Sequence, residues 1–475
     1  MTLKRLVLHR VTVAVLLLLI SFGTVIKIGA AEYSGTWGEA TIAPLLPEKS
    51  QWALVVIDMA TGTEKLHIGN SADKPLIPGS LVKLVTAGAL LDHAVANGTP
   101  DMSTTLGYDG LITEGTLKGN LYLTGRGNAF LSLAELKELT ASVTRQGIKR
   151  ILGDIVVDVS SFNVNGLERN LAGASQAEAG ALGLDLHTMA LTVTPGVAGS
   201  APLITVEPPN DDVRIALEAR TVALSANALQ IKRLDDVTYR VSGNIARGES
   251  TVTKRFPLNV PALYAGGTLR TLLRVGGVSV AGGVRKGRED GNVRNLAAVS
   301  TPDLDTLLRD MNMNSLNVVA DNLLLILGRE QFTPPGSREK GIRSVGTFLN
   351  KLEVLTDDMT ITDGSGLHNG NRMKAATVAH YLSKAAKQPW FERFYATLPT
   401  AGMEGTLRDV GFSDQRFRAK TGTLENSYAL AGYGTDRVGR RVSFAFIVNH
   451  PGVGVMDMKK VGATVMRYLS TEGSL

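Results

Sequence analysis

Strand-like sequence lies at both ends of this chain, and the stretch between them follows different patterns. The apolar run from Trp52 to Asp58, a Thr-Gly-Thr turn and residues 64–68 predict a β-hairpin, which precedes an apolar helix beginning at Ser80. Residues 417–449 predict three more strands, and a final helix follows them. We expect the two ends to form one mixed α/β domain, with the middle of the chain as an insertion.

The middle of the chain is predicted to hold a further small unit. Short β segments of alternating polarity run from about residue 195 to residue 255, separated by turn-forming residues and without a convincing long helix. A chain of 475 residues is long enough for two or three domains. The predicted fold class is mixed α/β, with a main domain of residues 35–98 and 299–475, an inserted domain II of residues 99–194 and 261–298, and a small β-rich domain III of residues 195–260.

The first 31 residues have the layout of a secretory signal peptide. Basic residues precede an apolar run from Val11 to Ile26, and small residues follow at positions 29–31. An uncleaved membrane anchor is the alternative, but the apolar run falls short of the usual spanning length. We therefore predict an exported, periplasmic protein from which residues 1–31 are removed.

Charge and composition limit the partners of the chain. The formal net charge of +6 becomes +2 without residues 1–31, and no basic stripe with interleaved aromatic residues remains. No nucleic-acid partner is therefore expected. The chain has no Cys, which excludes disulfides and thiolate catalysis, and its seven His residues form no His-x-x-x-His pair. We expect no metal site.

The tetrapeptide Ser80-Leu81-Val82-Lys83 places a nucleophile and a base one helical turn apart. Serine alone is a poor nucleophile, so a neighbouring amine that takes its proton would activate it. Apolar neighbours predict that this face is buried, and burial would lower the pKa of Lys83 from about 10.4 toward roughly 7–8. A second copy, residues 337–340, has two charged residues between its Ser and its Lys, and we expect Ser337 to be a helix N-cap.

Two further motifs follow in the chain. Ser315-Leu316-Asn317 lies at the junction of two helical patterns, unlike the other Ser-x-Asn occurrences, which lie at strand ends or turns. Lys420-Thr421-Gly422 precedes strand-like sequence, where the Lys amine and the Thr hydroxyl can hold a carboxylate and the Gly permits close approach of a substrate backbone. The backbone amides of Thr423 and Ser80 could together form an oxyanion hole.

With these three motifs in order, the chain resembles the active-site serine penicillin-recognising enzymes. The long interval between Ser80 and Ser315, residues 363–367 (Asp-Gly-Ser-Gly-Leu) and the segment 420–433 are similar to peptidase family S13. These are D-alanyl-D-alanine carboxypeptidase/endopeptidases of the penicillin-binding protein 4 type. The resemblance implies a β-lactamase/transpeptidase-like domain interrupted by domain II, which itself carries domain III.

The resemblance also implies the roles of the site residues. The penultimate D-Ala carbonyl would acylate Ser80, Lys83 would act as base, and Ser315 would relay a proton to the leaving D-Ala. The substrate-binding groups would be Asn317, Lys420, Thr421, Gly422 and the Thr423 amide. Peptidoglycan stem peptides would be the substrates and β-lactam antibiotics the inhibitors, and no metal or cofactor is implied. The sequence leaves a homodimer and a peripheral membrane association open.

Two segments depart from the family pattern, residues 124–131 and the Ala-rich stretch 171–186. Stem-peptide side-chain preference and endopeptidase activity are therefore less firmly implied than acylation. A β-lactamase or esterase on the same fold is one alternative, although no deacylating Glu can be assigned. A non-catalytic envelope scaffold is another. A Ser/His hydrolase built on residues 363–368 is disfavoured, because a Gly-rich turn explains them and no Gly-x-Ser-x-Gly elbow is present.

Overall fold

A six-stranded antiparallel sheet brings the two ends of the chain together. The computed structural model describes residues 35–164, 177–224, 228–453 and 458–471, so the predicted signal peptide and residues 171–176 lie outside the described residues. The sheet has the order β2-β1-β23-β22-β21-β20. Its strands are β2 (Glu64–Ile68), β1 (Gln51–Asp58), β23 (Arg441–Asn449), β22 (Ser427–Thr435), β21 (Asp414–Leu424) and β20 (Thr400–Ala401). Pairing of β1 with β23 joins the N-terminal hairpin to the C-terminal strands.

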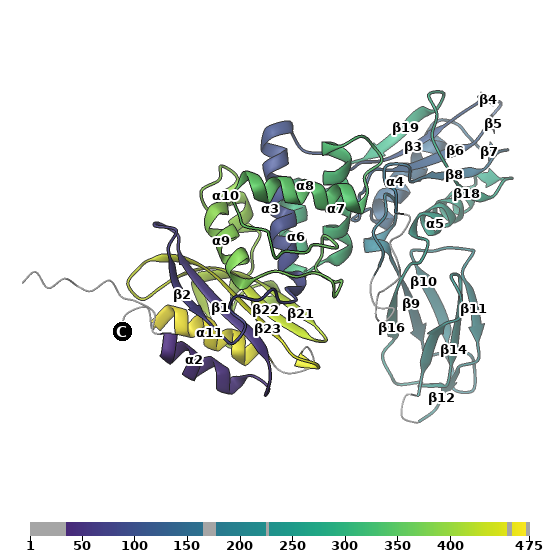
Figure 1. Cartoon of the computed structure of the whole chain (residues 1–475). Coiled ribbons are helices and arrows are strands. Elements are labelled where there is room, and N and C mark those ends of the chain that lie inside the picture. Colours follow the sequence, from purple (N-terminus) through teal and green to yellow (C-terminus); the bar gives the residue numbers. More distant parts are fainter. Residues whose placement is uncertain (1–34, 165–176, 225–227, 454–457, 472–475) are drawn as a thin grey trace, which may run out of the picture.

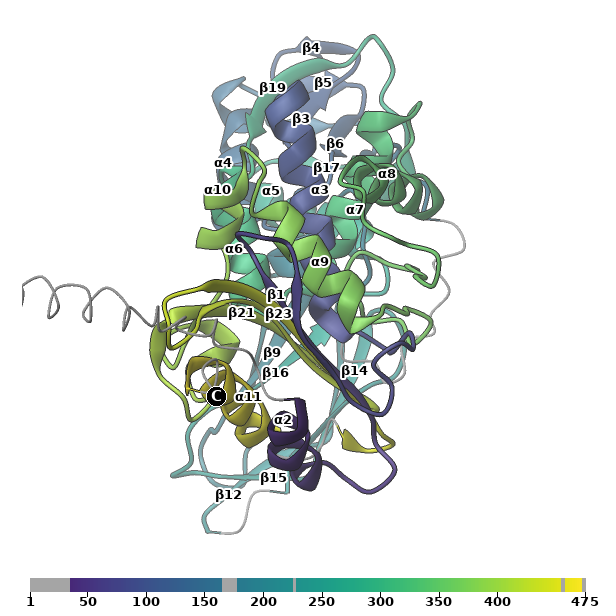
Figure 2. The same ribbon diagram turned by 60° about the vertical axis from the view of Figure 1, so that its left-hand side comes forward.

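Helices cover both faces of this sheet (Figures 1 and 2). Helices α2 (Gly35–Ile42) and α11 (Lys459–Thr471) pack on one face, where Trp52, Phe446 and Tyr468 belong to one apolar cluster. The other face carries a larger helical layer, which consists of α3 (Val82–Asn97), α6 (Leu304–Asn314), α7 (Asn317–Gln331), α8 (Arg338–Lys351), α9 (Ala375–Ala385) and α10 (Phe391–Ala396). The site described below lies where this layer meets β21.

Helix α3 is the buried centre of the helical layer. Its apolar residues are almost continuous, and Leu81, Val82 and Leu84 have no exposed surface. Among the described residues, the helical stretch Gly79–Asn97 is long and apolar enough to cross a membrane. However, 72% of its apolar window is buried inside the protein, as expected of a core helix.

The apolar stretch 304–328 forms two helices, which meet at the junction expected near Ser315. Helix α6 ends at Asn314, and Ser315 adopts the left-handed conformation with φ 55° and ψ 41°. Helix α7 then starts at Asn317. A non-glycine residue in this conformation is uncommon, and here it turns the chain so that the Ser-x-Asn motif occupies the bend between the helices.

Domain II is a second α/β unit inserted after α3 (Figure 1). One sheet has the order β18-β8-β6-β3-β19 and another has the order β17-β7-β5-β4. The strands are β3 (Thr104–Tyr108), β4 (Leu111–Thr113), β5 (Thr116–Lys118), β6 (Leu121–Gly125), β7 (Arg150–Ile151), β8 (Ile155–Asp158), β17 (Ser279–Val280), β18 (Val284–Gly287) and β19 (Arg294–Val299). Helices α4 (Leu133–Arg145) and α5 (Pro261–Val275) share a core with these strands.

The small third unit consists of strands only, within the described residues. Its pairings are β10-β9-β16, β11-β14-β13 and β12-β15. These strands are β9 (Thr188–Thr194), β10 (Leu203–Glu207), β11 (Arg214–Leu217), β12 (Arg220–Val222), β13 (Gln230–Arg233), β14 (Thr238–Ser242), β15 (Asn244–Ala246) and β16 (Val252–Pro257). Because β9 pairs with both β10 and β16, we propose to begin domain III at Thr188, earlier than the boundary of 195 expected from the sequence.

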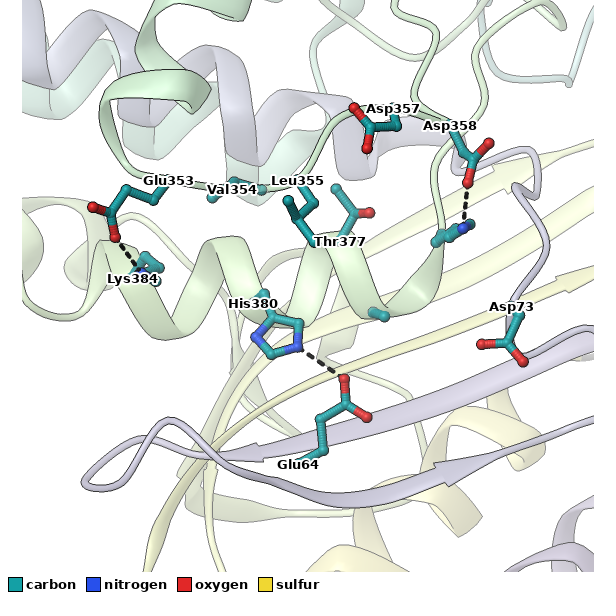
Figure 3. Close-up of a pocket in the computed structure, with 12 residues that line it drawn as sticks. Glu64, Asp73, Glu353, Val354, Leu355, Asp357, Asp358, Thr377, His380 and Lys384 are labelled. Carbon is teal, nitrogen blue, oxygen red and sulfur yellow. Dashed lines mark hydrogen bonds and ion pairs between the residues drawn. The ribbon is translucent and has the colours of Figure 1, made fainter.

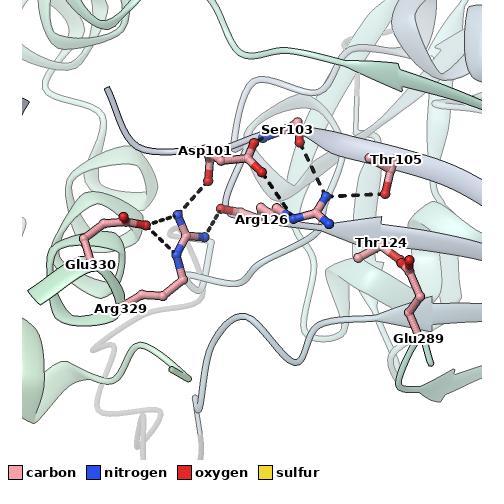
Figure 4. Close-up of polar contacts among 8 residues, drawn as sticks. All are labelled: Asp101, Ser103, Thr105, Thr124, Arg126, Glu289, Arg329 and Glu330. Carbon is pink, nitrogen blue, oxygen red and sulfur yellow. Dashed lines mark hydrogen bonds and ion pairs between the residues drawn. The ribbon is translucent and has the colours of Figure 1, made fainter. Parts of the chain in front are cut away.

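Helix α7 joins the main domain to domain II (Figure 4). The guanidinium of Arg329 donates to the carbonyls of Asp101, at 2.6 Å, and Arg126, at 3.0 Å. Arg126 in turn pairs with the Asp101 carboxylate at 3.3 Å. Two turns earlier on α7, the buried Asn322 side chain donates to the carbonyls of Gly127 and Gly180 and accepts from the Gly180 amide. One helix therefore carries the Ser-x-Asn residue Asn317 and contacts three loops of domain II.

Candidate active site

The turn that carries Ser80 packs directly against strand β21. The residues Gly79–Leu81 form a short 3-10 turn before α3, and Gly79 has a φ of 53°. A Cβ added to Gly422 would lie 2.9 Å from the Ser80 nitrogen and 2.8 Å from the Pro78 carbonyl oxygen. Gly422 is thus required by close packing, and Thr423 follows it beside the Ser80 turn.

The Lys83 amine is fully buried and lies within hydrogen-bonding distance of three oxygen atoms. Its Nζ is 2.9 Å from Ser80 Oγ, 2.5 Å from Asn317 Oδ1 and 2.7 Å from the carbonyl oxygen of Ser365. The two carbonyl-type oxygens can only accept hydrogen bonds. A neutral amine that donates its two N–H groups to Asn317 and Ser365 therefore directs its lone pair to the Ser80 hydroxyl, which is the geometry a general base requires.

Burial lowers the pKa of Lys83 to about 8, although the carboxylates of Asp321 and Asp363 raise it in part. An ordinary lysine stays almost fully protonated at neutral pH. Lys83 instead holds its proton weakly enough to exchange it near neutral pH, which suits a base that must accept a proton from Ser80 and later release it.

Ser315 connects Ser80 to a second buried lysine. Its Oγ lies 3.1 Å from Ser80 Oγ, and Lys420 Nζ donates to the same Ser315 oxygen at 3.0 Å. Lys420 has no exposed surface, and its Nζ also donates to the Thr421 carbonyl at 2.7 Å. Burial and the nearby charge of Lys83 hold the pKa of Lys420 well below its ordinary value. Four polar side chains thus form a continuous chain from Lys83 through Ser80 and Ser315 to Lys420.

The remaining expected residues lie at the same edge of β21. The Thr421 hydroxyl lies 2.7 Å from the hydroxyl of Thr406, which belongs to the turn after β20. A Cβ added to Gly79 would lie 3.6 Å from the Thr423 nitrogen, so this amide is adjacent to the Ser80 turn. The structure therefore brings together all the residues that the sequence singles out for catalysis and binding.

A model of known protein families matches residues 39–471, and it describes the D-Ala-D-Ala carboxypeptidase 3 (S13) family. The chain belongs to family S13. It is therefore an enzyme, a serine-type D-Ala-D-Ala carboxypeptidase of this family, in agreement with the resemblance in the three motifs.

Curated relatives and a solved structure extend the S13 assignment. A D-alanyl-D-alanine carboxypeptidase of Actinomadura sp. (strain R39) is 31% identical over 413 residues, which cover 80% of this chain and 74% of the relative. DacB of Haemophilus influenzae is 28% identical over 389 residues, which cover 77% of this chain and 79% of that protein. The crystal structure of H. influenzae penicillin-binding protein 4 superposes with a TM-score of 0.75 at 25% identity, over 90% of this chain and 97% of that one. The expected transpeptidase-like fold with its inserted domain is thereby confirmed.

The S13 site also contains groups that the sequence analysis did not assign. Residues 363–366 form a loop between α7 and the Ser80 turn, and the carbonyl of Ser365 accepts from Lys83. Gly366 has a φ of 80°, and a Cβ there would lie 1.8 Å from the Gly79 carbonyl oxygen. The Asp-Gly-Ser-Gly-Leu pattern indicated that this loop is unusual. It could not indicate the role of the Ser365 carbonyl, because every residue type has a backbone carbonyl. Asp321, whose carboxylate accepts from the Gly364 amide at 3.0 Å, carried no recognisable signal.

A separate cavity of about 340 Å³ lies between β2, α9 and residues 353–358 (Figure 3). Most of its charged residues pair with one another: His380 contacts Glu64 at 2.8 Å, and Lys384 contacts Glu353 at 3.2 Å. Lys374 pairs with an aspartate in the same way. Because these lining residues form ion pairs rather than a nucleophile and base in contact, the candidate S13 active site is the one at Ser80.

Proposed function

We propose that this S13 enzyme is an exported DD-peptidase that cleaves D-Ala-D-Ala bonds of peptidoglycan stem peptides through an acyl-Ser80 intermediate. One observation carries the proposal, namely the continuous contacts from Lys83 through Ser80 and Ser315 to Lys420. In that order the four residues supply a base, a nucleophile, a proton relay and a cation. Acyl transfer from a carboxylate-terminated peptide needs all four.

Acylation begins when Lys83 takes the Ser80 proton. The Asn317 and Ser365 oxygens hold the amine so that its lone pair points to the hydroxyl. Ser80 Oγ then attacks the carbonyl carbon of the penultimate D-Ala, and the carbonyl oxygen gains negative charge. The Ser80 and Thr423 amides form the oxyanion hole, and one such donor is typically worth about 10²–10³ in rate.

The leaving D-Ala requires a proton and a site for its carboxylate. Ser315 Oγ transfers its proton to the departing nitrogen as the peptide bond breaks, and the proton that Lys83 took from Ser80 then replaces it on Ser315. Lys420 and the Thr421 hydroxyl bind the terminal carboxylate, which favours the charged form of the buried amine. Asn317 holds the substrate amide, and Gly422 allows the substrate backbone to lie along β21.

Water then hydrolyses the acyl-enzyme and restores Ser80. β-Lactams react by the same attack, and their ring-opened product stays bonded to Ser80 because it blocks the approach of water. The likeness to H. influenzae penicillin-binding protein 4, which has also been solved in complex with a β-lactam, supports this step. Export to the periplasm stays a prediction that rests on residues 1–31, and a homodimer and a peripheral membrane association stay untested predictions.

The test is release of D-Ala from an N-acylated peptide that ends in D-Ala-D-Ala. We expect turnover by the wild type and none by Ser80→Ala, while Ser337→Ala, in the second Ser-x-x-Lys copy, retains activity. A peptide ending in L-Ala-L-Ala serves as the substrate control. Release of D-Ala by Ser80→Ala would contradict the mechanism, and a wild type inactive on the peptide that still binds penicillin without covalent attachment would favour a non-catalytic scaffold.

A further inference from the structure

Asp321 occupies the turn of α7 that follows Asn317. Residues four apart lie on the same helix face, so its carboxyl group lies beside the residue that contacts Lys83. Asp321 is partly buried, and its Oδ1 accepts from the Gly364 amide at 3.0 Å. The acyl-Ser80 mechanism gives this carboxyl group no role.

The Gly364–Ser365 segment links Asp321 to Lys83. The Gly364 carbonyl accepts from the Thr86 hydroxyl of α3 at 2.9 Å, while its amide donates to Asp321 of α7. The next carbonyl, of Ser365, accepts from Lys83 Nζ at 2.7 Å. A Cβ on Gly364 would lie 2.4 Å from the Ala320 carbonyl oxygen, which shows how closely this segment packs on α7. Asp321 therefore fixes the peptide that presents an acceptor to Lys83.

We propose that Asp321 is a positioning residue that sets the pH range of acylation by controlling when Lys83 loses its proton. This inference rests on the proposed role of Lys83 as the base that activates Ser80. Asp321 acts through Lys83 and through the Gly364–Ser365 segment, and it contacts neither the substrate nor Ser80.

Three charged groups face Lys83, one from each element packed against it. They are Asp321 on α7, Asp363 on the loop and Lys420 on β21. The Asp363 carboxylate accepts from the Gly366 amide at 2.6 Å, the His368 amide at 2.7 Å and the Asn371 side chain at 3.0 Å. These donors tie the Asp363 carboxylate to the loop structure. The Asp321 carboxyl group accepts from fewer such donors, of which the Gly364 amide is one.

The charge of Asp321 changes in the range where the base works. Burial, with a further contribution from the charge of Asp363, raises the pKa of Asp321 to about 7, while Lys83 lowers it in part. The pKa of Lys83 is about 8, and ionised Asp321 raises it. The two groups therefore titrate as a coupled pair, in which loss of the Asp321 proton delays loss of the Lys83 proton.

The sign of the expected effect follows from this coupling. Replacing Asp321 with a neutral residue of the same shape removes a negative charge that stabilises protonated Lys83. The pKa of Lys83 then falls, and the neutral base forms at lower pH. An opposite charge this close typically shifts a pKa by about one unit or more.

The experiment measures the rate of acylation by benzylpenicillin as a function of pH for the wild type, Asp321→Asn and Asp321→Glu. The acid limb of the pH–rate profile is the range in which acylation slows as the pH falls. We expect this limb to lie about one pH unit lower in Asp321→Asn than in the wild type. Asp321→Glu keeps the charge and should keep the limb close to that of the wild type. Asp357→Asn removes one negative charge in the separate cavity and serves as the matched control, with an unchanged limb.

The outcomes separate this inference from the proposed function. A wild type that penicillin does not acylate would contradict the acyl-Ser80 mechanism itself. A folded Asp321→Asn that is acylated with the wild-type acid limb, whether fast or slow, would overturn the role of Asp321 alone. If Asp321→Asn does not fold, infrared spectra of the wild type test the proposal. The proposal is supported by the band of a protonated carboxyl group that disappears between pH 6 and 8 and shifts when penicillin acylates the protein. The absence of such a band refutes it.

Discussion

At the scale of single residues, the two Ser-x-x-Lys copies show that the surroundings decide the chemistry. The Lys83 amine is buried and contacts Ser80, while Lys340 points its amine to the carbonyls of Thr333 and Pro335. Ser337 Oγ accepts from the Lys340 amide at 3.3 Å, as an N-cap does, and α8 begins at the next residue. The same residue pair is therefore a buried serine–lysine contact, our proposed nucleophile and base, in one place and a helix cap in the other.

Ser337→Ala is expected to lower the free energy of unfolding by about 1 kcal/mol, because the α8 N-terminus loses its side-chain acceptor. Penicillin acylation should be unchanged, since the Ser337 side chain binds the Lys340 amide of its own helix. Urea denaturation and acylation kinetics on the same variant measure the two effects. A large fall in acylation without loss of stability would show that the second copy has a chemical role.

The chemistry-bearing side chains of the site could be predicted because each belongs to a short motif. Ser80, Lys83, Ser315, Asn317 and Lys420 were all identified from the sequence and lie in contact in the structure. Their roles in catalysis remain predictions.

The environment of the base could not be predicted from the sequence. The Lys83 amine donates to the backbone carbonyl of Ser365, and any residue type supplies such an oxygen. Its position depends on a loop that is 282 residues away from Lys83 in the sequence. Asp321 looks like an ordinary polar residue of a helix until α3 and the loop pack against it. Long-range packing, rather than local pattern, creates both contacts.

At the scale of elements, the loop of residues 363–366 depends on close backbone approach. Gly366 has a positive φ, and a Cβ there would lie 1.8 Å from the Gly79 carbonyl oxygen. The loop and the Ser80 turn therefore fit together only when this position lacks a side chain, and the Ser365 carbonyl is held against Lys83 as a result.

Gly366→Ala should destabilise the protein by roughly 1–3 kcal/mol and slow penicillin acylation, because the loop must move away from the Ser80 turn. The matched control is Gly346→Ala in α8, where no atom lies within 4 Å of the added Cβ. That change should stabilise the protein by about 0.5–1 kcal/mol and leave acylation unchanged. Thermal unfolding and acylation kinetics compare the pair, and equal effects of the two substitutions would contradict this account of the loop.

The elements themselves followed the sequence pattern where periodicity was strong. The predicted hairpin and the three C-terminal strands are β1, β2 and β21–β23, and the predicted final helix is α11. Helix α5 begins at Pro261, because Pro is accepted in the first turn and small residues carry the helix onward. The helix junction at Ser315 could be predicted, but the left-handed conformation of this residue could not, because it is set by packing rather than by a Gly.

At the scale of the whole molecule, the junction between domain II and the small β-rich unit contains a fully buried histidine. His187 precedes β9, and its Nδ1 lies 2.7 Å from the Glu178 carbonyl oxygen, to which it can donate as a neutral ring. Burial lowers the pKa of His187 to about 4, although this hydrogen bond raises it in part. The folded state therefore excludes the charged imidazolium.

Stability should fall as the solution is acidified from about pH 6.5 toward pH 4. An unfolded His has a pKa near 6.5, so the unfolded chain binds a proton in this range that folded His187 refuses. Above about pH 6.5, the neutral His187 ring contributes about 3 kcal/mol to the free energy of unfolding, and this contribution is lost as the pH falls toward 4. We expect the Tm of the wild type to drop more between pH 7 and pH 5 than that of His187→Gln. Equal drops would contradict the role of His187.

The organisation of the whole molecule was predictable in outline, because strands at both ends of the chain required a shared sheet. The attachment of the inserted unit was not. It depends on α7, where Asn322 and Arg329 bind backbone groups of domain II loops far away in the sequence. The helix that presents Asn317 to Lys83 is therefore also the helix on which domain II rests.

The central claim is that Ser80 is the residue acylated. Mass spectrometry of the protein after incubation with benzylpenicillin and peptide digestion tests it most directly. The account predicts one penicilloyl adduct, on the peptide that contains Ser80, and no adduct in Ser80→Ala. An adduct on any other residue, Ser315 and Ser337 included, would contradict the account.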